Sequence, residues 1–328
     1  MDGTAVELDY GKKSDKREEM KINIYNEYSP LQSVIIGDAS NLYFPDIHDI
    51  ENEANKPLWV KLKNKLIYRI IKGKKVPKWI SKNFQRELAA FEKLLRENDV
   101  EVYKVAPIIP EEGEALGLGQ MYARDSAMSV GDLFIEGHLQ IDMRQKERRG
   151  YQNLVADMKE QHLKVATISQ DEPIYLEGGD VVVDYPNVFV GIGKYASNLA
   201  GLDWLRQQLD DSWNVIPIRI VDDSILHLDC CMTIIGPKTA IICRDVLGEL
   251  PKELKDFTFI EINKKVRHQM AGNVLVLGNK KVVVQKRHKQ LQEDLMKHGF
   301  TPLPLEFTWH ALLEGALRCA SCPLERKD

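Results

Sequence analysis

The sequence lacks a long apolar run, an apolar N-terminal segment and a set of paired cysteines. Nowhere in the 328 residues is there a run of the roughly 18 apolar residues that a membrane-spanning helix needs. Half of the first twenty residues are charged, which argues against a secretory signal and predicts a flexible charged tail over residues 1–20. Five cysteines, an odd number, do not suggest a disulfide framework, so we expect a cytoplasmic protein.

Neither sign of charge dominates the whole chain. It has 45 Lys+Arg against 49 Asp+Glu, a net charge of −4, so no partner nucleic acid is expected. The exception is the segment 56–86, which has eleven basic residues and no acidic one, with apolar residues at helical spacing. This pattern predicts a basic helical insertion. It is compatible with an anionic membrane or acidic partner, but charge runs are more often the solvated lysine face of a packed helix.

The chain also lacks a linker rich in Pro, Gly or Ser, so we expect one α/β domain over residues 21–328. Helical spacing of apolar residues predicts helices at 83–98, 199–209 and 290–298. Apolar runs predict strands at 31–37, 100–105, 127–135, 181–192, 233–243, 274–277 and 282–285. A recurring strand-strand-helix-strand unit is consistent with this order.

Residue types used by active sites are grouped just before predicted strands and near the C-terminus. They are Arg124, Asp125, Glu177, Asp180, His227, Asp229 and Cys319. A cysteine nucleophile needs a thiolate and a nearby proton-transfer group, which a histidine can supply. Carboxylates accept the N–H groups of a planar, delocalised cation in pairs. The combination predicts a guanidine as the substrate.

Each of these groups also has a purely structural interpretation. His227 and Asp229 could form a structural pair, Asp125 an ion pair with Arg124, and Cys319 a buried packing residue. A zinc site built from Cys319, Cys322, His227, Cys230 and Cys231 lacks a second C-x-x-C, and adjacent cysteines chelate one metal poorly. A redox pair of Cys319 and Cys322 would lie unusually close to the C-terminus. The apolar surroundings of Cys230, Cys231 and Cys243 predict core positions.

Several segments, in this order, resemble the amidinotransferases of the guanidino-group-modifying superfamily. They are residues 25–37 (YNEYSPLQSVIIG), 124–126 (RDS), 227–237 (HLDCCMTIIGP), 273–277 (NVLVL) and the terminal Cys319. The resemblance covers about residues 22–325. It implies an α/β-propeller (pentein) of five ββαβ units with pseudo-five-fold symmetry around a central site.

The resemblance also implies roles for single residues. Cys319 is expected to attack the guanidine carbon, and His227 to protonate the departing amine and then deprotonate the second nucleophile. Asp180 and Asp229 are expected to grip the guanidinium, and Asp125 to orient the site. The expected intermediate is a covalent amidino-thioether on Cys319, with no metal or organic cofactor.

The identity of the second nucleophile is open. An amine would make the protein an amidinotransferase, which is the function expected here. Water would make it a deiminase or amidinohydrolase, and the segment 176–180 (LEGGD) and Arg318 resemble that branch. A third alternative is a non-catalytic binding protein that acts through its basic helix.

Further substrate-binding candidates are Glu177, Arg124, Arg244 and Glu314. Glu314 occupies the position at which the resemblance to arginine deiminases implies an Arg that holds the substrate carboxylate, so Glu314 is expected to meet a cationic group or solvent instead. Arg244 is the candidate anchor for a carboxylate. The expected partners are therefore a small guanidine and an amine acceptor, and the sequence leaves open whether the protein is a homo-oligomer.

Overall fold

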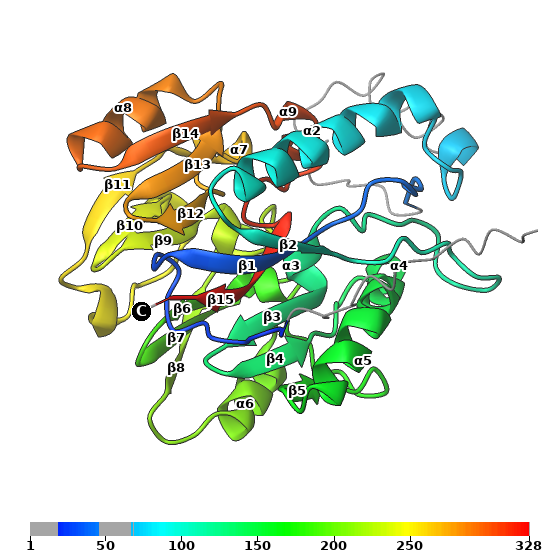
Figure 1. Ribbon diagram of the computed structural model, residues 1–328, viewed down its shortest axis with the longest axis horizontal. Helices are drawn as coiled ribbons and strands as arrows, with labels where there is room; N and C mark the ends of the chain where they lie inside the picture. The colour runs from blue at the N-terminus through cyan, green and yellow to red at the C-terminus, as the bar shows by residue number, and fades with distance from the viewer. Residues whose placement is uncertain (1–18, 46–66, 68, 328) are drawn as a thin grey trace, which may run out of the picture.

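The computed structural model describes residues 19–45, 67 and 69–327, and its strands form five three-stranded sheets (Figure 1). In every sheet the middle strand pairs antiparallel with one neighbour and parallel with the other. In order from the first strand of each unit, the sheets are β15 (Ser321–Arg326), β1 (Leu31–Ile36) and β2 (Glu101–Lys104); β3 (Ala127–Val130), β4 (Leu133–Glu136) and β5 (Lys164–Thr167); β6 (Val181–Asp184), β7 (Asn187–Ile192) and β8 (Asn214–Arg219); β9 (Met232–Gly236), β10 (Thr239–Ile242) and β11 (Thr258–Glu261); and β12 (Leu275–Gly278), β13 (Lys281–Gln285) and β14 (Thr301–Leu305).

Burial shows how the sheets are oriented. The first strands β3, β9 and β12 are buried at every residue, whereas the third strands β5, β8 and β14 carry several exposed or half-buried residues. First strands also meet across neighbouring sheets, since β15 contacts β3 and β6 contacts β9. The sheets are therefore blades whose first strands lie at the centre, and the predicted five-fold α/β-propeller is confirmed.

Four of the five crossovers that join the parallel strands contain an α-helix. These helices are α2 (Lys78–Arg96), α5 (Gln152–Glu160), α6 (Leu199–Gln208) and α8 (Lys289–Lys297). The fourth unit differs, because its crossover from β10 to β11 has only the short 3₁₀ turns η4 (Arg244–Val246) and η5 (Lys252–Leu254). The ββαβ pattern therefore holds in four units and is shortened in one.

The last strand of the chain completes the first blade. β15 pairs antiparallel with β1, with Ile36 opposite Ser321 and Leu31 opposite Arg326. Further backbone hydrogen bonds join Asn23 to Leu324 and Arg326. β15 is the first strand of its blade and lies at the centre of the ring. Its pairing with β1 therefore brings the residues just before it, including Cys319, to the middle of the ring.

Three predicted strands are in fact hairpins. The ranges 127–135, 181–192 and 233–243 each hold two antiparallel strands separated by a two-residue turn. Strands that are buried on both faces produce nearly continuous apolar runs, and a turn of two residues barely interrupts such a run. The expected helices at 199–209 and 290–298 agree with α6 and α8.

The predicted basic insertion at 56–86 is not a single inserted element. Its last part, 78–86, is the beginning of α2, which starts five residues before the predicted 83 and packs Phe84, Phe91 and Leu95 against the core. That part belongs to the first blade and is not inserted. Residues 56–66 of the predicted insertion and 1–18 of the predicted tail lie outside the described residues.

The described part of the chain begins within the predicted tail. Met20 is 5% exposed, packs in an apolar cluster with the second blade, and donates its backbone N–H to Gln161. Among the described residues no helix is both long and apolar enough to span a membrane.

Candidate active site

Each blade has one polar residue just before its first strand, which is the strand at the centre of the ring. Short helical turns hold three of them: α3 (Ala123–Ser126), η2 (Gly178–Asp180) and η3 (Leu228–Cys230). α3 contacts η2, and η2 contacts η3, so these turns lie next to one another around the centre. The five residues, in blade order from β3, are Asp125, Asp180, Asp229, Asn273 and Cys319. The fold therefore brings together residues that are almost 200 positions apart.

Cys319 is buried at the centre, with 2% of its surface exposed. Its Sγ lies 3.0 Å from Asn273 Nδ2 and 3.5 and 3.6 Å from the two oxygens of Asp229. Asn273 also accepts the backbone N–H groups of Arg318 and Cys319 through Oδ1, at 3.0 and 3.1 Å. Asn273 thus holds both the thiol and its loop. The sequence interpretation missed this role, although Asn273 precedes a predicted strand as the other site residues do.

The surroundings of Cys319 favour its neutral thiol over the thiolate. Burial raises its pKa well above the usual value, and the nearby carboxylates of Asp229 and Asp125 raise it further. A cation bound between these carboxylates would reverse this effect, because it favours the thiolate.

His227 is held between two carboxylates. Its Nε2 is 2.8 Å from Glu177 Oε2, and its Nδ1 is 3.8 Å from Asp125 Oδ1. Burial disfavours the charged imidazole, but Asp125 and Glu177 outweigh burial and raise the pKa of His227 well above its usual range. His227 is therefore suited to donate a proton. Glu177, predicted to bind substrate, instead orients the histidine, and its other oxygen accepts the backbone N–H of Gln140.

Asp125 has one occupied oxygen and one free oxygen. Its Oδ2 accepts a hydrogen bond of 2.8 Å from Arg144, which Glu147 holds from the other side, also at 2.8 Å. Its Oδ1 is buried without a hydrogen-bond partner among the described residues. The predicted alternative of an ion pair between Asp125 and Arg124 is wrong, since Arg144 is the partner. Neither Arg144 nor Glu147 could be predicted from the sequence, because their contacts depend on the fold.

Asp180 and Asp229 differ in their surroundings. Both oxygens of Asp180 accept backbone N–H groups, from Leu228 at 2.8 Å and from Ser197 at 3.0 Å, and burial raises its pKa to about 7. Asp180 therefore fixes the loop that carries His227. Asp229 binds Arg318 through Oδ2 at 3.0 Å and directs Oδ1 toward the thiols. Asp180 and Asp229 were both expected to bind a guanidinium. Of these two, Asp229 is the one with oxygens next to the sulfur of Cys319.

Arg318, the residue just before Cys319, takes part in buried ion pairs. Arg318 donates to Glu27 at 2.8 Å as well as to Asp229. Although burial disfavours the charged carboxylate, Arg318 and Arg124 lower the pKa of Glu27 to about 2. Arg124 is itself buried and donates through Nε to the Arg318 carbonyl, at 3.1 Å. Arg124 thus supports the loop before Cys319 and does not present its charge to a substrate.

The two remaining substrate-binding candidates lie outside this cluster of contacts. Arg244 is on the surface, where it pairs with Glu261 at 3.3 Å and lies over the ring of Phe259. Glu314 is half-buried in the loop before Cys319, with a left-handed φ of 62°. The predicted carboxylate anchor at Arg244 is therefore not supported by its position.

The cysteines do not assemble the zinc set or the redox pair that were considered as alternatives. All five are free, and Cys319 and Cys322 belong to different apolar clusters. Within the described residues, the group with the spacing of metal ligands is Asp229, Cys230 and Cys319. Cys231 and Cys243 are buried, as predicted for core residues.

Comparison with known proteins agrees with this geometry. A model of the eukaryotic N,N-dimethylarginine dimethylhydrolase family matches residues 68–326. The chain belongs to this family. Mitochondrial glycine amidinotransferase of Gallus gallus is 22% identical over 354 residues, which cover 92% of this chain and 82% of the relative. The predicted membership of the amidinotransferase family is thus confirmed.

Solved structures of both kinds of enzyme share the fold. Inosamine-phosphate amidinotransferase from Streptomyces griseus matches with a TM-score of 0.80 at 19% identity, covering 94% of this chain and 98% of that one. The N-terminal domain of a cyanobacterial arginine dihydrolase matches with a TM-score of 0.66 at 16% identity, covering 90% and 98%. The chain therefore shares the fold of enzymes of both kinds.

Proposed function

We propose that the protein transfers the amidino group of a guanidine to an amine through a covalent intermediate on Cys319. The observation that carries this proposal is the buried set of Cys319, His227, Asp125 and Asp229. It supplies a nucleophile, a proton donor and carboxylate oxygens for a planar cation at the centre of the ring.

Binding of the guanidinium would activate the nucleophile. The free Oδ1 of Asp125 and the Oδ1 of Asp229 are the acceptors available for its N–H groups. The incoming positive charge lowers the pKa of the Cys319 thiol, which the carboxylates had raised, so the thiolate forms when substrate is present. Without a bound cation, most of the Cys319 thiol therefore stays protonated at neutral pH.

The transfer would proceed in two halves. The thiolate attacks the guanidine carbon, and the C–N bond to the departing amine breaks as protonated His227 gives that amine a proton. An amidino-thioether remains on Cys319. The acceptor amine then loses a proton to neutral His227 and attacks the same carbon, which breaks the C–S bond and restores the thiolate.

The burial of the site favours an amine over water as the acceptor. Cys319 and His227 are each 2% exposed. Exclusion of water protects a covalent intermediate from hydrolysis until an acceptor enters. Hydrolysis is the second candidate function, and the family model whose description names a dimethylhydrolase favours it.

We further propose that the donor carries a carboxylate, which Arg267 would bind. Arg267 lies in α7 (Lys264–His268), is 7% exposed, and has an Nε without a hydrogen-bond partner among the described residues. Its positive charge opposes the rise that burial causes in the pKa of Cys231 and Cys243, and it also acts on Cys230, which lies beside Cys319. It replaces Arg244 as the anchor, and arginine is the simplest donor that fits.

Product analysis from labelled arginine separates the two functions. With a panel of amines present, a transferase gives ornithine and a labelled guanidine that depends on the amine. A hydrolase gives citrulline, or ornithine plus urea, without any amine. Turnover that is equal with and without amines would contradict the transferase, and absence of turnover with every guanidine donor would contradict both.

A further inference from the structure

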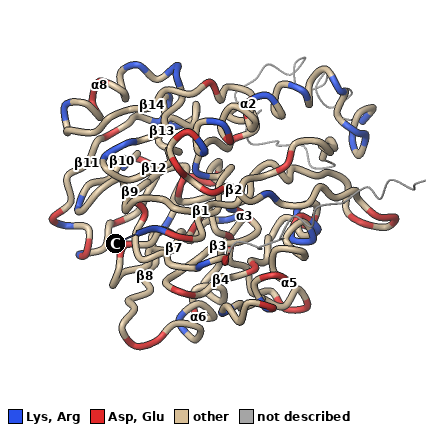
Figure 2. Tube along the Cα trace, in the orientation of Figure 1, with Lys and Arg blue, Asp and Glu red and all other residues tan. Residues whose placement is uncertain are grey.

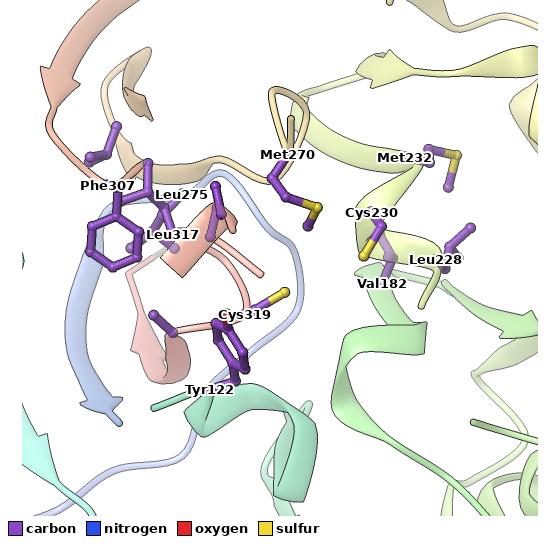
Figure 3. Close-up of a cluster of buried hydrophobic side chains, with 14 of the residues drawn as sticks. Tyr122, Val182, Leu228, Cys230, Met232, Met270, Leu275, Phe307, Leu317 and Cys319 are labelled. Carbon is purple, nitrogen blue, oxygen red and sulfur yellow. The ribbon is translucent and has the colours of Figure 1, made fainter. Parts of the chain in front are cut away.

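A second thiol lies beside the nucleophile and has no part in the transfer chemistry. Cys230 follows Asp229 in the chain, and Asp229 Oδ1 is 3.6 Å from the sulfur of Cys230 and 3.6 Å from that of Cys319. The two sulfurs and a carboxylate oxygen of Asp229 all lie within 4.8 Å of one another. Figure 3 shows the side chains of Cys230 and Cys319 extending toward each other from different blades.

The other cysteines are engaged elsewhere. Cys231 has its sulfur 3.8 Å from the His227 carbonyl oxygen, and Cys322 has its sulfur 3.4 Å from the Ala127 carbonyl oxygen. Within the described residues, Cys230 is therefore the thiol placed to reach Cys319. A disulfide requires a sulfur separation of about 2.05 Å, so the two loops would have to approach by a few ångströms.

We propose that Cys230 is a resolving thiol, which captures oxidised Cys319 as a reversible intramolecular disulfide when the enzyme meets a peroxide. The Cys319 thiolate attacks one peroxide oxygen, the O–O bond breaks, and a sulfenic acid and hydroxide form. The Cys230 thiolate then attacks the Cys319 sulfur, the S–O bond breaks, and hydroxide leaves. In sum, two thiols and one hydrogen peroxide give one disulfide and two waters.

The electrostatics of the site set the conditions for this modification. A hydrogen bond with Cys319 lowers the pKa of Cys230, but burial and Asp229 raise it to about 11. Burial also raises the pKa of Cys319. Because the thiolate is the reacting form, oxidation should become about tenfold faster for each unit by which the pH rises, as long as the pH stays below the pKa of the reacting thiol. The same disulfide would protect Cys319 from irreversible over-oxidation.

The test is peptide mapping of the full-length protein after treatment with hydrogen peroxide. Trypsin leaves Cys230 and Cys231 on the peptide 220–238, and Cys319 and Cys322 on 319–326. After free thiols are blocked, the non-reduced map should contain these two peptides joined by one disulfide. Fragmentation should assign the bond to Cys230 and Cys319, and dithiothreitol should remove it.

Matched variants decide the assignment. In Cys231→Ser and Cys322→Ser the joined peptides should still form. In Cys230→Ser and Cys230→Ala they should disappear, and Cys319 should proceed to sulfinic acid that dithiothreitol does not reverse. A disulfide within 319–326, or persistence of the joined peptides in both Cys230 variants, would overturn the proposal. The map does not require turnover, so it stands apart from any failure of the proposed transferase activity.

Discussion

At the scale of single residues, the chemistry depends on which carboxylate oxygens already accept hydrogen bonds from the protein and which face the substrate. Asp180 has both oxygens occupied by backbone N–H groups, whereas Asp125 and Asp229 each direct one oxygen into the site. Two residues of the same type thus hold a loop or face the substrate according to their neighbours.

Glu177→Gln should reduce the transfer rate by about a hundredfold, because it removes one of the carboxylates that raise the pKa of His227. His227 must be protonated to serve as the acid, so wild type stays active up to a high pH. In the variant the pKa falls, and the alkaline limb of the pH–rate profile should move to lower pH. Glu261→Gln, on the surface beside Arg244, is the control. An unshifted alkaline limb would contradict the role given to Glu177.

Arg267→Met should raise KM for arginine by about 10- to 100-fold, because the variant loses a charge-assisted hydrogen bond to the carboxylate of the substrate. Agmatine, which lacks the carboxylate, should be handled alike by wild type and variant. Arg244→Met is the matched control and should leave both substrates unaffected. Equal losses with arginine and agmatine would show that Arg267 supports the fold and not the carboxylate.

The sequence pointed to Cys319, His227 and three aspartates, which the fold brings close to one another, but not to several of the residues that hold them. Cys319 and His227 belong to types whose chemistry is distinctive, so their pattern could be interpreted without a structure. Asn273, Arg144 and Glu27 are common residue types, and their importance comes from contacts with residues far away in the chain. Only the fold could reveal those contacts.

At the scale of elements, α2 combines a buried face with a strongly basic exposed surface (Figure 2). In and just before its first turns, Lys74, Lys78, Lys82 and Arg86 are exposed. Trp79 and Ile70 are exposed nearby, by 70% and 58%. Basic and aromatic side chains together are typical of helices that lie on anionic membranes.

We expect this surface to bind vesicles of anionic phospholipid in sedimentation experiments, and salt to weaken the binding. Charge reversal at Lys74, Lys78 and Lys82 should abolish it, while reversal at Lys289 and Lys297 of α8 should not. Failure of the wild type to sediment, or binding that survives the reversal in α2, would leave a solvated lysine face. Binding to acidic proteins alone would replace the membrane as partner.

The boundaries of elements were harder to predict than their existence. α6 and α8 have clear helical periodicity and were located to within a residue. The hairpins at 127–135 and 181–192 were predicted as single strands, because buried strands and their short turns share one apolar run. The start of α2 was missed because its first turn is basic and resembles the segment before it.

At the scale of the whole molecule, one central ion pair joins distant parts of the ring. Glu27, from the segment before β1, binds Arg318, whose second partner is Asp229 of the fourth blade and which also donates to the Val181 carbonyl of the third. Closure of the ring therefore positions the nucleophile loop and also buries two opposite charges. The sequence alone did not show five-fold order, because it arises from strand pairing and from contact between β1 and β15.

Glu27→Gln should lower the free energy of unfolding by about 3 kcal/mol at neutral pH, because it leaves Arg318 buried with one fewer counter-charge. The pKa of Glu27 falls from 4.5 to about 2 on folding, so its carboxylate stabilises the protein above pH 4.5. That contribution is lost as the pH falls toward 2. Urea unfolding should therefore show a difference from wild type that shrinks between pH 5 and pH 2. A difference independent of pH would contradict this account.

The most direct test of the central claim is to look for the covalent intermediate. The enzyme is incubated with arginine in the absence of an amine, quenched in acid, and digested for peptide mass spectrometry. The peptide 319–326 should gain the mass of one amidino group at Cys319, and an added acceptor amine should remove it. Cys319→Ala should show neither adduct nor turnover. Full activity of Cys319→Ala, or turnover by wild type with no adduct at Cys319 under any quench, would contradict the account.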